Sequence, residues 1–563
     1  MSPESKVDKS GAILSIGVAL TTLIVWTSGL TEPVGMPKLA ILTPTSLILL
    51  GYFLPNAKAL FREQKVAVMA VVLFLVWMAF AALVSSNPIS RSFYGVEARR
   101  TGWLTYFSFG AIFLIATFMR TAKSRKRIYS AFLICGLFNV IYSLIVLISK
   151  KDPIPWNNVY GTILGTFGNP NFISAFLGLF VVALFAIFVD AKIKLPLRVL
   201  SAIGILVSVY EIIETSSIQG LVVVVLGISI VLGVYLKFQF KNNKLTLGYF
   251  LSLGVMAVVG ILGTLQKGPL ATLLYKDSVS FRGEYWFAGI RMIQSSPVFG
   301  LGPDSYGNWY RQFRDSSSIV RPGIETTANT AHNVFIDIGV NGGIPVLLAY
   351  LVLQALVLTK IFAILKRSAT FDGTFWSFSV IWICYHAQSM ISINQIGLGI
   401  WGWVFGGLIL SYQTPSLDSK LEAPISEKLT YGKRNTISSE SGAGVVFASI
   451  GGLISILLVF PPLAADHAWR AALQASDANV LDQALEKWPR ESGRLIFGSE
   501  IFANNKLNDF ALKFARLAVQ DDPNNYESWR TLSKTPGASI EEIQKAKQEM
   551  IRLDPLNPDL KAN

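Results

Sequence analysis

The sequence predicts an all-α protein: a polytopic membrane helical bundle of about 12–13 transmembrane helices, followed by a C-terminal soluble α-helical repeat domain. Hydrophobic residues make up 52% of the 563 residues and charged residues only 15%, and the mean hydropathy is +0.49. A soluble protein of this length carries many more charges. Apolar runs close to the length that crosses a bilayer recur along the chain up to residue 464, and the remainder is polar.

Thirteen apolar runs are expected to span the membrane, at residues 11–29, 37–54, 66–85, 103–119, 129–149, 172–189, 198–213, 218–236, 246–264, 339–359, 374–391, 394–412 and 444–464. The first run is too long for a signal peptide and lacks a small-residue cleavage site, so we interpret it as an uncleaved helix. The predicted domains are therefore a transmembrane domain (1–412), a cytoplasmic linker (413–443), a final transmembrane helix (444–464) and an extracytoplasmic domain (465–563).

The distribution of lysine and arginine predicts which loops lie inside. With the N-terminus in the cytoplasm, the inner loops hold most of the basic residues and the short outer loops hold few. This orientation puts the long loop 265–332 and the segment 465–563 outside. The net charge of +14 then reflects basic cytoplasmic loops facing anionic lipid, and nucleic acid is not an expected partner. Cys135 and Cys384 both fall inside apolar runs and predict neither a disulfide framework nor a metal site.

The segment 465–563 has the spacing of a helical repeat. Helix-forming stretches end in Asp-Pro at residues 522–523 and 554–555, and Pro489, Pro523 and Pro555 recur at intervals typical of the tetratricopeptide repeat. The alternative is an unrelated array of helical hairpins. Either arrangement predicts an interaction or spacer domain and a possible protein partner.

Four features on the outer face could carry chemistry. The first is the loop 86–102, where Arg99 and Arg100 oppose the charge rule for an outer loop. Planar guanidinium groups suit bidentate contacts with a diphosphate, and the alternative is solvation or contact with lipid headgroups. The second is the Gly-Asn-Pro-Asn-Phe stretch at 168–172, where Asn171 could cap the following helix or contact a substrate.

The third feature is the long loop itself. Residues 281–288 begin an amphipathic helix that is expected to run to Ile293, and the segment 297–303 breaks it. Arg282 stands at the head of this interfacial helix, where it could meet a diphosphate or simply snorkel to the headgroups.

The fourth feature is His332, one of only three histidines. An imidazole can accept a proton near neutral pH, and the alternative is a polar residue hydrogen-bonded at a helix start. Asn333 fits either interpretation, as a substrate contact or a structural residue. His386 lies near the outer end of its helix and could line the same cavity, whereas His467 is expected to be solvated.

Together these features resemble the O-antigen ligase and O-antigen polymerase family of bacterial polytopic membrane glycosyltransferases. The resemblance covers roughly residues 11–412, and its most specific parts are Arg282-Gly283-Glu284-Tyr285-Trp286, Pro297 through Gly302, Ala331-His332-Asn333 and Gly339-Val340-Asn341-Gly342-Gly343. The stretches at 95–99 and 168–172 resemble a subgroup with tetratricopeptide tails. One departure stands out: where many ligases have Ser-Arg-Gly, this chain has Ser217-Ile218-Gln219-Gly220.

The resemblance implies transfer of a glycan from an undecaprenyl-diphosphate carrier to an acceptor at the outer face of the bacterial inner membrane. It implies that Arg282 and Arg99 hold the diphosphate, with Arg100 as a further candidate, and that His332 orients or deprotonates the acceptor hydroxyl. Inversion at the anomeric carbon is expected, with no cofactor and no metal. The acceptor can be a lipid, a glycan or a protein, so ligase, polymerase and protein O-oligosaccharyltransferase all stay open. The competing classes are a lipid or polysaccharide transporter or flippase, which predicts internal repeats and mid-membrane charges, and a non-catalytic scaffold.

Overall fold

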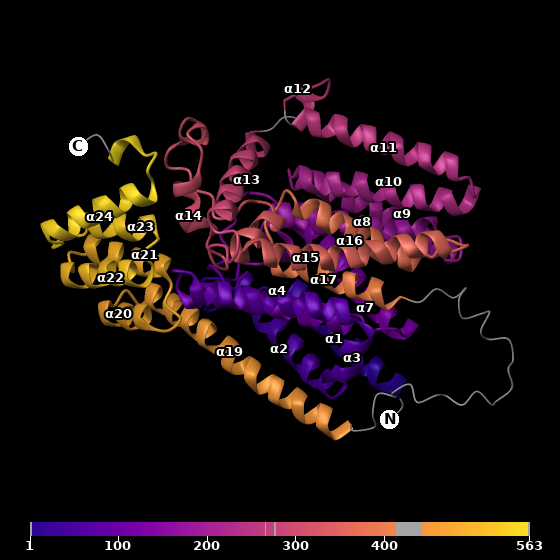
Figure 1. The fold of residues 1–563 in the computed structure, drawn as a ribbon, viewed down its shortest axis with the longest axis horizontal. Coiled ribbons are helices and arrows are strands. Elements are labelled where there is room, and N and C mark those ends of the chain that lie inside the picture. The colour runs from indigo at the N-terminus through magenta and orange to yellow at the C-terminus, as the bar shows by residue number, and fades with distance from the viewer. Residues whose placement is uncertain (1–2, 265, 275–276, 413–440, 561–563) are drawn as a thin grey trace.

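The computed structural model describes residues 3–264, 266–274, 277–412 and 441–560, and over these ranges the chain is helical without strands. Most helices run side by side along the long axis of the molecule, and the C-terminal helices stand at one end (Figure 1). Within the described ranges, nine helices are long and apolar enough to cross a membrane, and three shorter apolar helices accompany them. The predicted polytopic helical bundle is confirmed.

Each of the thirteen predicted spans overlaps a helix of the bundle. These helices are α1 (Pro3–Leu23), α2 (Gly35–Phe53), α4 (Lys65–Val84), α6 (Trp103–Ala116), α7 (Ala122–Ser149), α8 (Pro170–Val189), α9 (Leu195–Glu214), α10 (Ile218–Phe240), α11 (Asn243–Thr264), α15 (Val334–Arg367), α16 (Gly373–Ser389), α17 (Ile396–Ser411) and α19 (Ser441–Ala475). Short elements join them: η1 (Leu54–Asn56), α3 (Ala57–Glu63), α5 (Ile89–Tyr94) and η2 (Gly165–Phe167).

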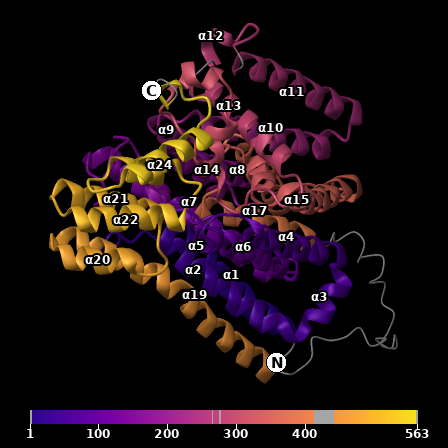
Figure 2. The same ribbon diagram turned by 60° about the vertical axis from the view of Figure 1, so that its left-hand side comes forward.

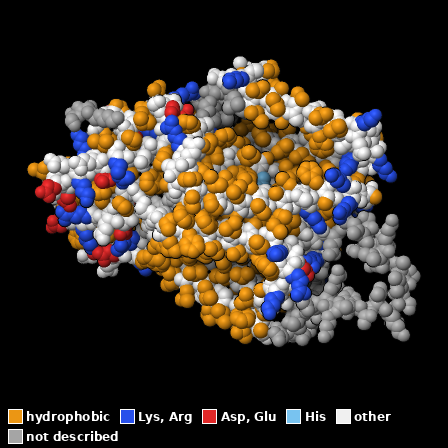
Figure 3. Space-filling view, in the orientation of Figure 1, with side chains coloured by type: hydrophobic (Ala, Val, Ile, Leu, Met, Phe, Trp, Pro, Cys, Tyr) orange, Lys and Arg blue, Asp and Glu red, His pale blue; other side chains and the backbone are white. Residues whose placement is uncertain are grey.

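The bundle has a packed centre and an apolar exterior. Helix α8 is largely buried, because it packs against α7, α9, α10 and α16. Helix α11, by contrast, presents Leu251, Val255 and Ile261 to the outside. A broad apolar surface covers the middle of the molecule, and basic side chains gather at the end opposite the C-terminal helices (Figure 3). An exposed apolar belt of this size is costly in water and favourable in lipid.

The prediction that Asn171 caps the helix after residue 168 was wrong. Helix α8 is capped by Asn169, whose side chain accepts a hydrogen bond from the Asn171 backbone N–H at 2.9 Å. Pro170 occupies the first helical position, where its missing N–H costs nothing and its fixed φ suits the helix. The cap therefore comes before the proline, and the Asn171 side chain instead accepts from the Ser217 hydroxyl.

The segment between α11 and α15 carries α12 (Ala271–Leu274), α13 (Asp277–Ser295), α14 (Tyr306–Phe313) and the turn η3 (Ile319–Gly323). It is anchored in a break within α15, where Gly343 has a φ of +73°. The break frees backbone groups, so the Val340 carbonyl accepts from Leu301 N and Ile344 N donates to the Pro297 carbonyl, each at 2.7 Å. The turn predicted at 297–303 thus fills the interruption in the membrane helix.

The C-terminal domain, defined here as residues from 465 on, begins inside α19. It continues with α20 (Ala478–Glu486), α21 (Ser492–Asn504), α22 (Asn508–Asp521), α23 (Tyr526–Lys534), α24 (Ile540–Leu553) and η4 (Pro558–Leu560). Helix α19 runs beside α2 and leads directly into this domain (Figure 2). Helices α21 with α22 and α23 with α24 pack as consecutive pairs. The assignment as tetratricopeptide repeats stays a prediction.

Candidate active site

His332 lies at the end of the bundle that carries the C-terminal domain, immediately before α15. Its backbone has a φ of +52°, a conformation that residues other than glycine rarely adopt. Thr330 holds this turn, because its hydroxyl oxygen accepts from His332 N at 3.1 Å. Asn333 then caps α15 by accepting from Phe335 N and Ile336 N. Strained residues of this kind cluster at functional sites, where the surrounding structure holds them in place.

The His332 ring is oriented by its neighbours. Nδ1 lies 3.3 Å from the Thr330 carbonyl oxygen and 3.2 Å from the Thr330 hydroxyl oxygen. In the tautomer that donates from Nδ1 to the carbonyl oxygen, Nε2 is left as an acceptor. The ring packs on Tyr285 of α13, with centroids 5.3 Å apart. Burial, together with the positive charges of Arg282 and Arg99, lowers the pKa of His332 to about 4. The imidazole is therefore neutral at pH 7.

Arg282 has no carboxylate or hydrogen-bond partner among the described residues. It stands on α13 one turn before Tyr285 and is partly buried, and burial lowers its pKa. Its charge contributes to the lowered pKa of His332, and Tyr285, one turn further along α13, packs on the His332 ring. A partly buried guanidinium without a counter-ion is costly unless an anion reaches it. Arg282 is thus the site's available cation.

Arg99 approaches the site from the loop before α6. One guanidinium nitrogen lies 2.7 Å from Asp304 and another donates to the Asn329 carbonyl at 2.9 Å. Asp304 also accepts from Val96 N at 2.7 Å, so it fixes the loop that presents Arg99. The Nε of Arg99 is buried and has no partner among the described residues. The structure therefore brings His332, Arg282 and Arg99 together.

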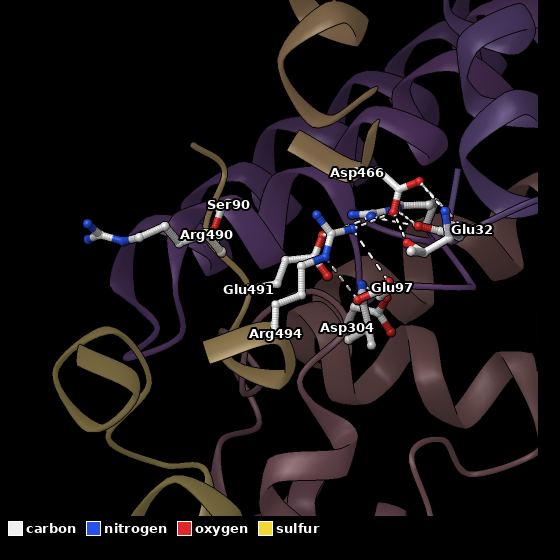
Figure 4. A network of polar contacts seen from close by, with 11 residues as sticks. Glu32, Ser90, Glu97, Asp304, Asp466, Arg490, Glu491 and Arg494 are labelled. Carbon is white, nitrogen blue, oxygen red and sulfur yellow. Dashed lines mark hydrogen bonds and ion pairs between the residues drawn. The ribbon is translucent and has the colours of Figure 1, made fainter. Parts of the chain in front are cut away.

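Two other predicted binding residues have structural partners. Arg100 is buried in ion pairs with Glu32 at 2.6 Å and Glu491 at 2.8 Å, in a polar network between the bundle and the C-terminal domain (Figure 4). The attraction of these carboxylates raises the pKa of Arg100 despite its burial. The side-chain oxygen of Asn333 accepts the two hydrogen bonds of the helix cap described above. The Arg100 guanidinium and the Asn333 side-chain oxygen are therefore already engaged within the protein.

The two remaining histidines lie apart from this arrangement. His386 is within α16, where Nδ1 lies 2.8 Å from the Trp382 carbonyl and the ring packs against Trp382, Tyr385 and Tyr350. His467 is exposed at the start of the C-terminal domain, as the sequence suggested.

Sequence reasoning missed two carboxylates of the site. Asp304 follows the predicted turn at 297–303 and orients Arg99. Asp337 lies in the first turn of α15, where it accepts from Ala331 N at 2.8 Å and so ties down the residue before His332. An aspartate in the first turn of an apolar helix was the available signal for Asp337, because a charge there needs a partner.

Carboxylates gather at one further place that could in principle hold a metal ion. Single oxygens of Glu32, Glu97 and Asp466 come within 4.8 Å of one another. Arg100 and Arg494 already pair with these three carboxylates, at distances of 2.6–3.4 Å. The group is therefore a buried ion-pair network, and the metal independence expected of the reaction stays a prediction.

The fold and the site define a polytopic membrane protein with a neutral histidine and two arginines at one end of the bundle. A family model described as O-antigen ligase matches residues 203–351, a range that contains both Arg282 and His332. The match covers only part of the chain; it supports the O-antigen ligase family and a membrane glycosyltransferase-type role in polysaccharide biosynthesis. A comparison with curated proteins found no match.

Proposed function

We propose that this chain transfers an oligosaccharide or polysaccharide from an undecaprenyl-diphosphate carrier to an acceptor hydroxyl, at the extracytoplasmic face of the bacterial inner membrane. The observation that carries the proposal is Arg282, which has no partner in the part of the chain that the structure describes, on the helix that packs against a neutral His332. Arg282 and the free Nε of Arg99 are suited to the diphosphate, since guanidinium groups bind its oxygens in pairs. They stabilise the charge that develops on this leaving group.

The His332 side chain takes the acceptor proton in this scheme. The acceptor oxygen forms a bond to the anomeric carbon, the bond from that carbon to the diphosphate breaks, and the proton moves to Nε2. A single in-line displacement inverts the anomeric configuration. The proton then leaves to solvent, and undecaprenyl diphosphate is released.

The charges around His332 give the donor a second role. In the free protein, burial and then the charges of Arg282 and Arg99 hold the pKa of His332 low, so its ring is a weak base. A bound diphosphate offsets these positive charges and raises the pKa towards the range in which an imidazole accepts protons well. Base strength would thus depend on donor binding, which limits proton transfer when no donor is present.

The test is transfer by the purified protein. Defined undecaprenyl-diphosphate oligosaccharides are incubated with a lipid, a glycan and a peptide acceptor, and the products are identified by mass. His332→Gln is expected to lower the rate by roughly 10²–10⁴-fold, as for loss of a positioned base. The matched control is His467→Gln, which changes an exposed histidine outside the site. Equal rates in wild type and His332→Gln would exclude the proposed base, and the acceptor that reacts identifies ligase, polymerase or protein glycosylation.

A further inference from the structure

The C-terminal domain does not stand free of the proposed active site. Helix α14 of the long loop packs against α24 of that domain. Its two sides differ: Tyr306 and Tyr310 pack towards α13, whereas Asn308 and Arg311 meet the C-terminal domain. One short helix therefore contacts the wall of the site and the repeat-like domain at once.

The first contact is centred on Asp554, which caps the C-terminus of α24 and is fully buried. Arg314 donates to both of its carboxylate oxygens, at 2.8 and 2.9 Å, and Arg311 donates to one of them at 3.2 Å. The Arg311 guanidinium also lies 4.4 Å from the centre of the Tyr526 ring. Two buried guanidinium groups thus share one carboxylate, and Arg311 also pairs with Glu527 at 3.2 Å and with Glu325 at 3.7 Å.

The second contact repeats this arrangement one helix pair earlier. Asp522 caps α22, is fully buried, and accepts from Asn308 at 2.8 Å. Arg91 of α5 forms an ion pair with the same carboxylate. The aspartates of the two Asp-Pro boundaries, on which the predicted repeat rests, therefore both accept hydrogen bonds from loops of the bundle.

Two routes lead from these aspartates to His332. Arg311 and Arg314 each donate a second hydrogen bond, to the Ile324 carbonyl at 3.2 and 2.8 Å, and so hold the segment that continues to residue 332. The other route runs through rings: Tyr310 packs on Tyr285 with centroids 5.6 Å apart, and Tyr285 packs on His332. Moving the domain would shift both the backbone and the ring face that orient the histidine.

We propose that the C-terminal domain positions the site, with Asp554 and Asp522 as positioning residues that hold α14 and the 314–332 segment in place. Helix α14 already contacts Asp522 and Asp554, the aspartates at the C-terminal ends of α22 and α24. The domain therefore binds a helix of its own chain there, and a protein partner would need another surface. This inference rests on the proposed role of His332.

The test compares Asp554→Asn with a matched control, Asp482→Asn. Asp482 is also an aspartate of the C-terminal domain, but it pairs only with Lys513 of the same domain, at 2.6 Å. Asp554→Asn is expected to lower kcat by roughly 10–10²-fold, since small misplacements of catalytic groups have effects of this size. The donor KM should stay within about threefold, because Arg282 and Arg99 do not contact Asp554. Asp554→Glu should recover part of the loss.

Hydrogen exchange supplies a readout that does not depend on transfer. In Asp554→Asn, amides of residues 314–332 should exchange faster, while those of α8 and α21 keep their protection. Asn308→Ala removes one uncharged donor and serves as a milder variant if Asp554→Asn does not fold. Unchanged exchange and unchanged kcat in the folded variants would overturn the inference. If His332→Gln retains transfer but exchange still rises over 314–332, the proposed base is wrong and the positioning contact stands.

Discussion

Replacing Arg282 by glutamine tests the donor site most directly. The substitution keeps a side chain of similar length with hydrogen-bond donors and removes the charge. Because Arg282 has no ion-pair partner among the described residues, the substitution breaks no ion pair, and removal of a partly buried charge should not lower stability. Loss of one donor to a developing oxyanion lowers kcat by roughly 10²–10³-fold, or about 2.7–4 kcal/mol of transition-state stabilisation.

The same helix offers the control. Arg291 lies nine residues after Arg282 and so on the opposite face of α13, at about 100° per residue. Its side chain is 44% exposed, covers the Phe287 ring and lies 3.7 Å from Asp315. Arg291→Gln should therefore transfer at the wild-type rate. The assay measures release of undecaprenyl diphosphate from a defined donor under single-turnover conditions.

A second readout separates charge from contact. Arg282 lowers the pKa of His332, so Arg282→Gln should raise it, and labelling of the imidazole by an acylating reagent should shift its midpoint to higher pH. Wild-type turnover in Arg282→Gln, together with an unchanged midpoint, would refute the reasoning, because Arg282 would then lie outside the site.

Two further predictions concern stability. Burial raises the pKa of Glu32 from 4.5 to about 8, against the opposing attraction of Arg100; stability is then fully present below about pH 4.5 and is lost as the pH rises through 8, by up to about 1.4 kcal/mol per pH unit. The Glu32→Gln variant should flatten the fall in the unfolding midpoint between about pH 5 and 8, and an unchanged slope would contradict this. Gly343→Ala should destabilise by about 1–3 kcal/mol, since its φ of +73° and ψ of −172° suit glycine alone and a Cβ would lie 2.6 Å from the Pro297 carbonyl oxygen. The control is Gly248→Ala, at a position in α11 where a Cβ meets nothing within 4 Å. Equal unfolding midpoints for the two variants would argue against the break in α15 at Gly343.

The membrane helices could be predicted from the sequence because each depends on local composition. A bilayer requires an apolar run of sufficient length, so the run itself places the helix to within a few residues. The amphipathic helix predicted from 281 to Ile293 appears as α13, since its apolar spacing is also local. The family resemblance predicted that Arg282 and His332 lie near each other. The structure shows that Tyr285, on the same helix as Arg282, packs on the His332 ring.

The partners of the polar residues could not be predicted in this way. Arg100 pairs with Glu491, far along the chain in the C-terminal domain, and no sequence pattern near Arg100 predicts that contact. The same holds for Asp304, which meets Arg99 only because the turn at 297–303 enters the break in α15. Such pairings depend on tertiary packing, which a single sequence does not display.

The continuity of α19 has a mechanical consequence. This helix continues from the last membrane span to Ala475 and contains Pro461 and Pro462, so the C-terminal domain is joined to the span by helical turns that follow these prolines. Adding or removing one residue after residue 465 would turn the domain about the helix axis by about 100° and carry it away from Arg311 and Arg314. The number of residues in α19 after residue 465 is therefore constrained by helix rotation. Only insertions or deletions close to whole helical turns would keep the C-terminal domain facing Arg311 and Arg314.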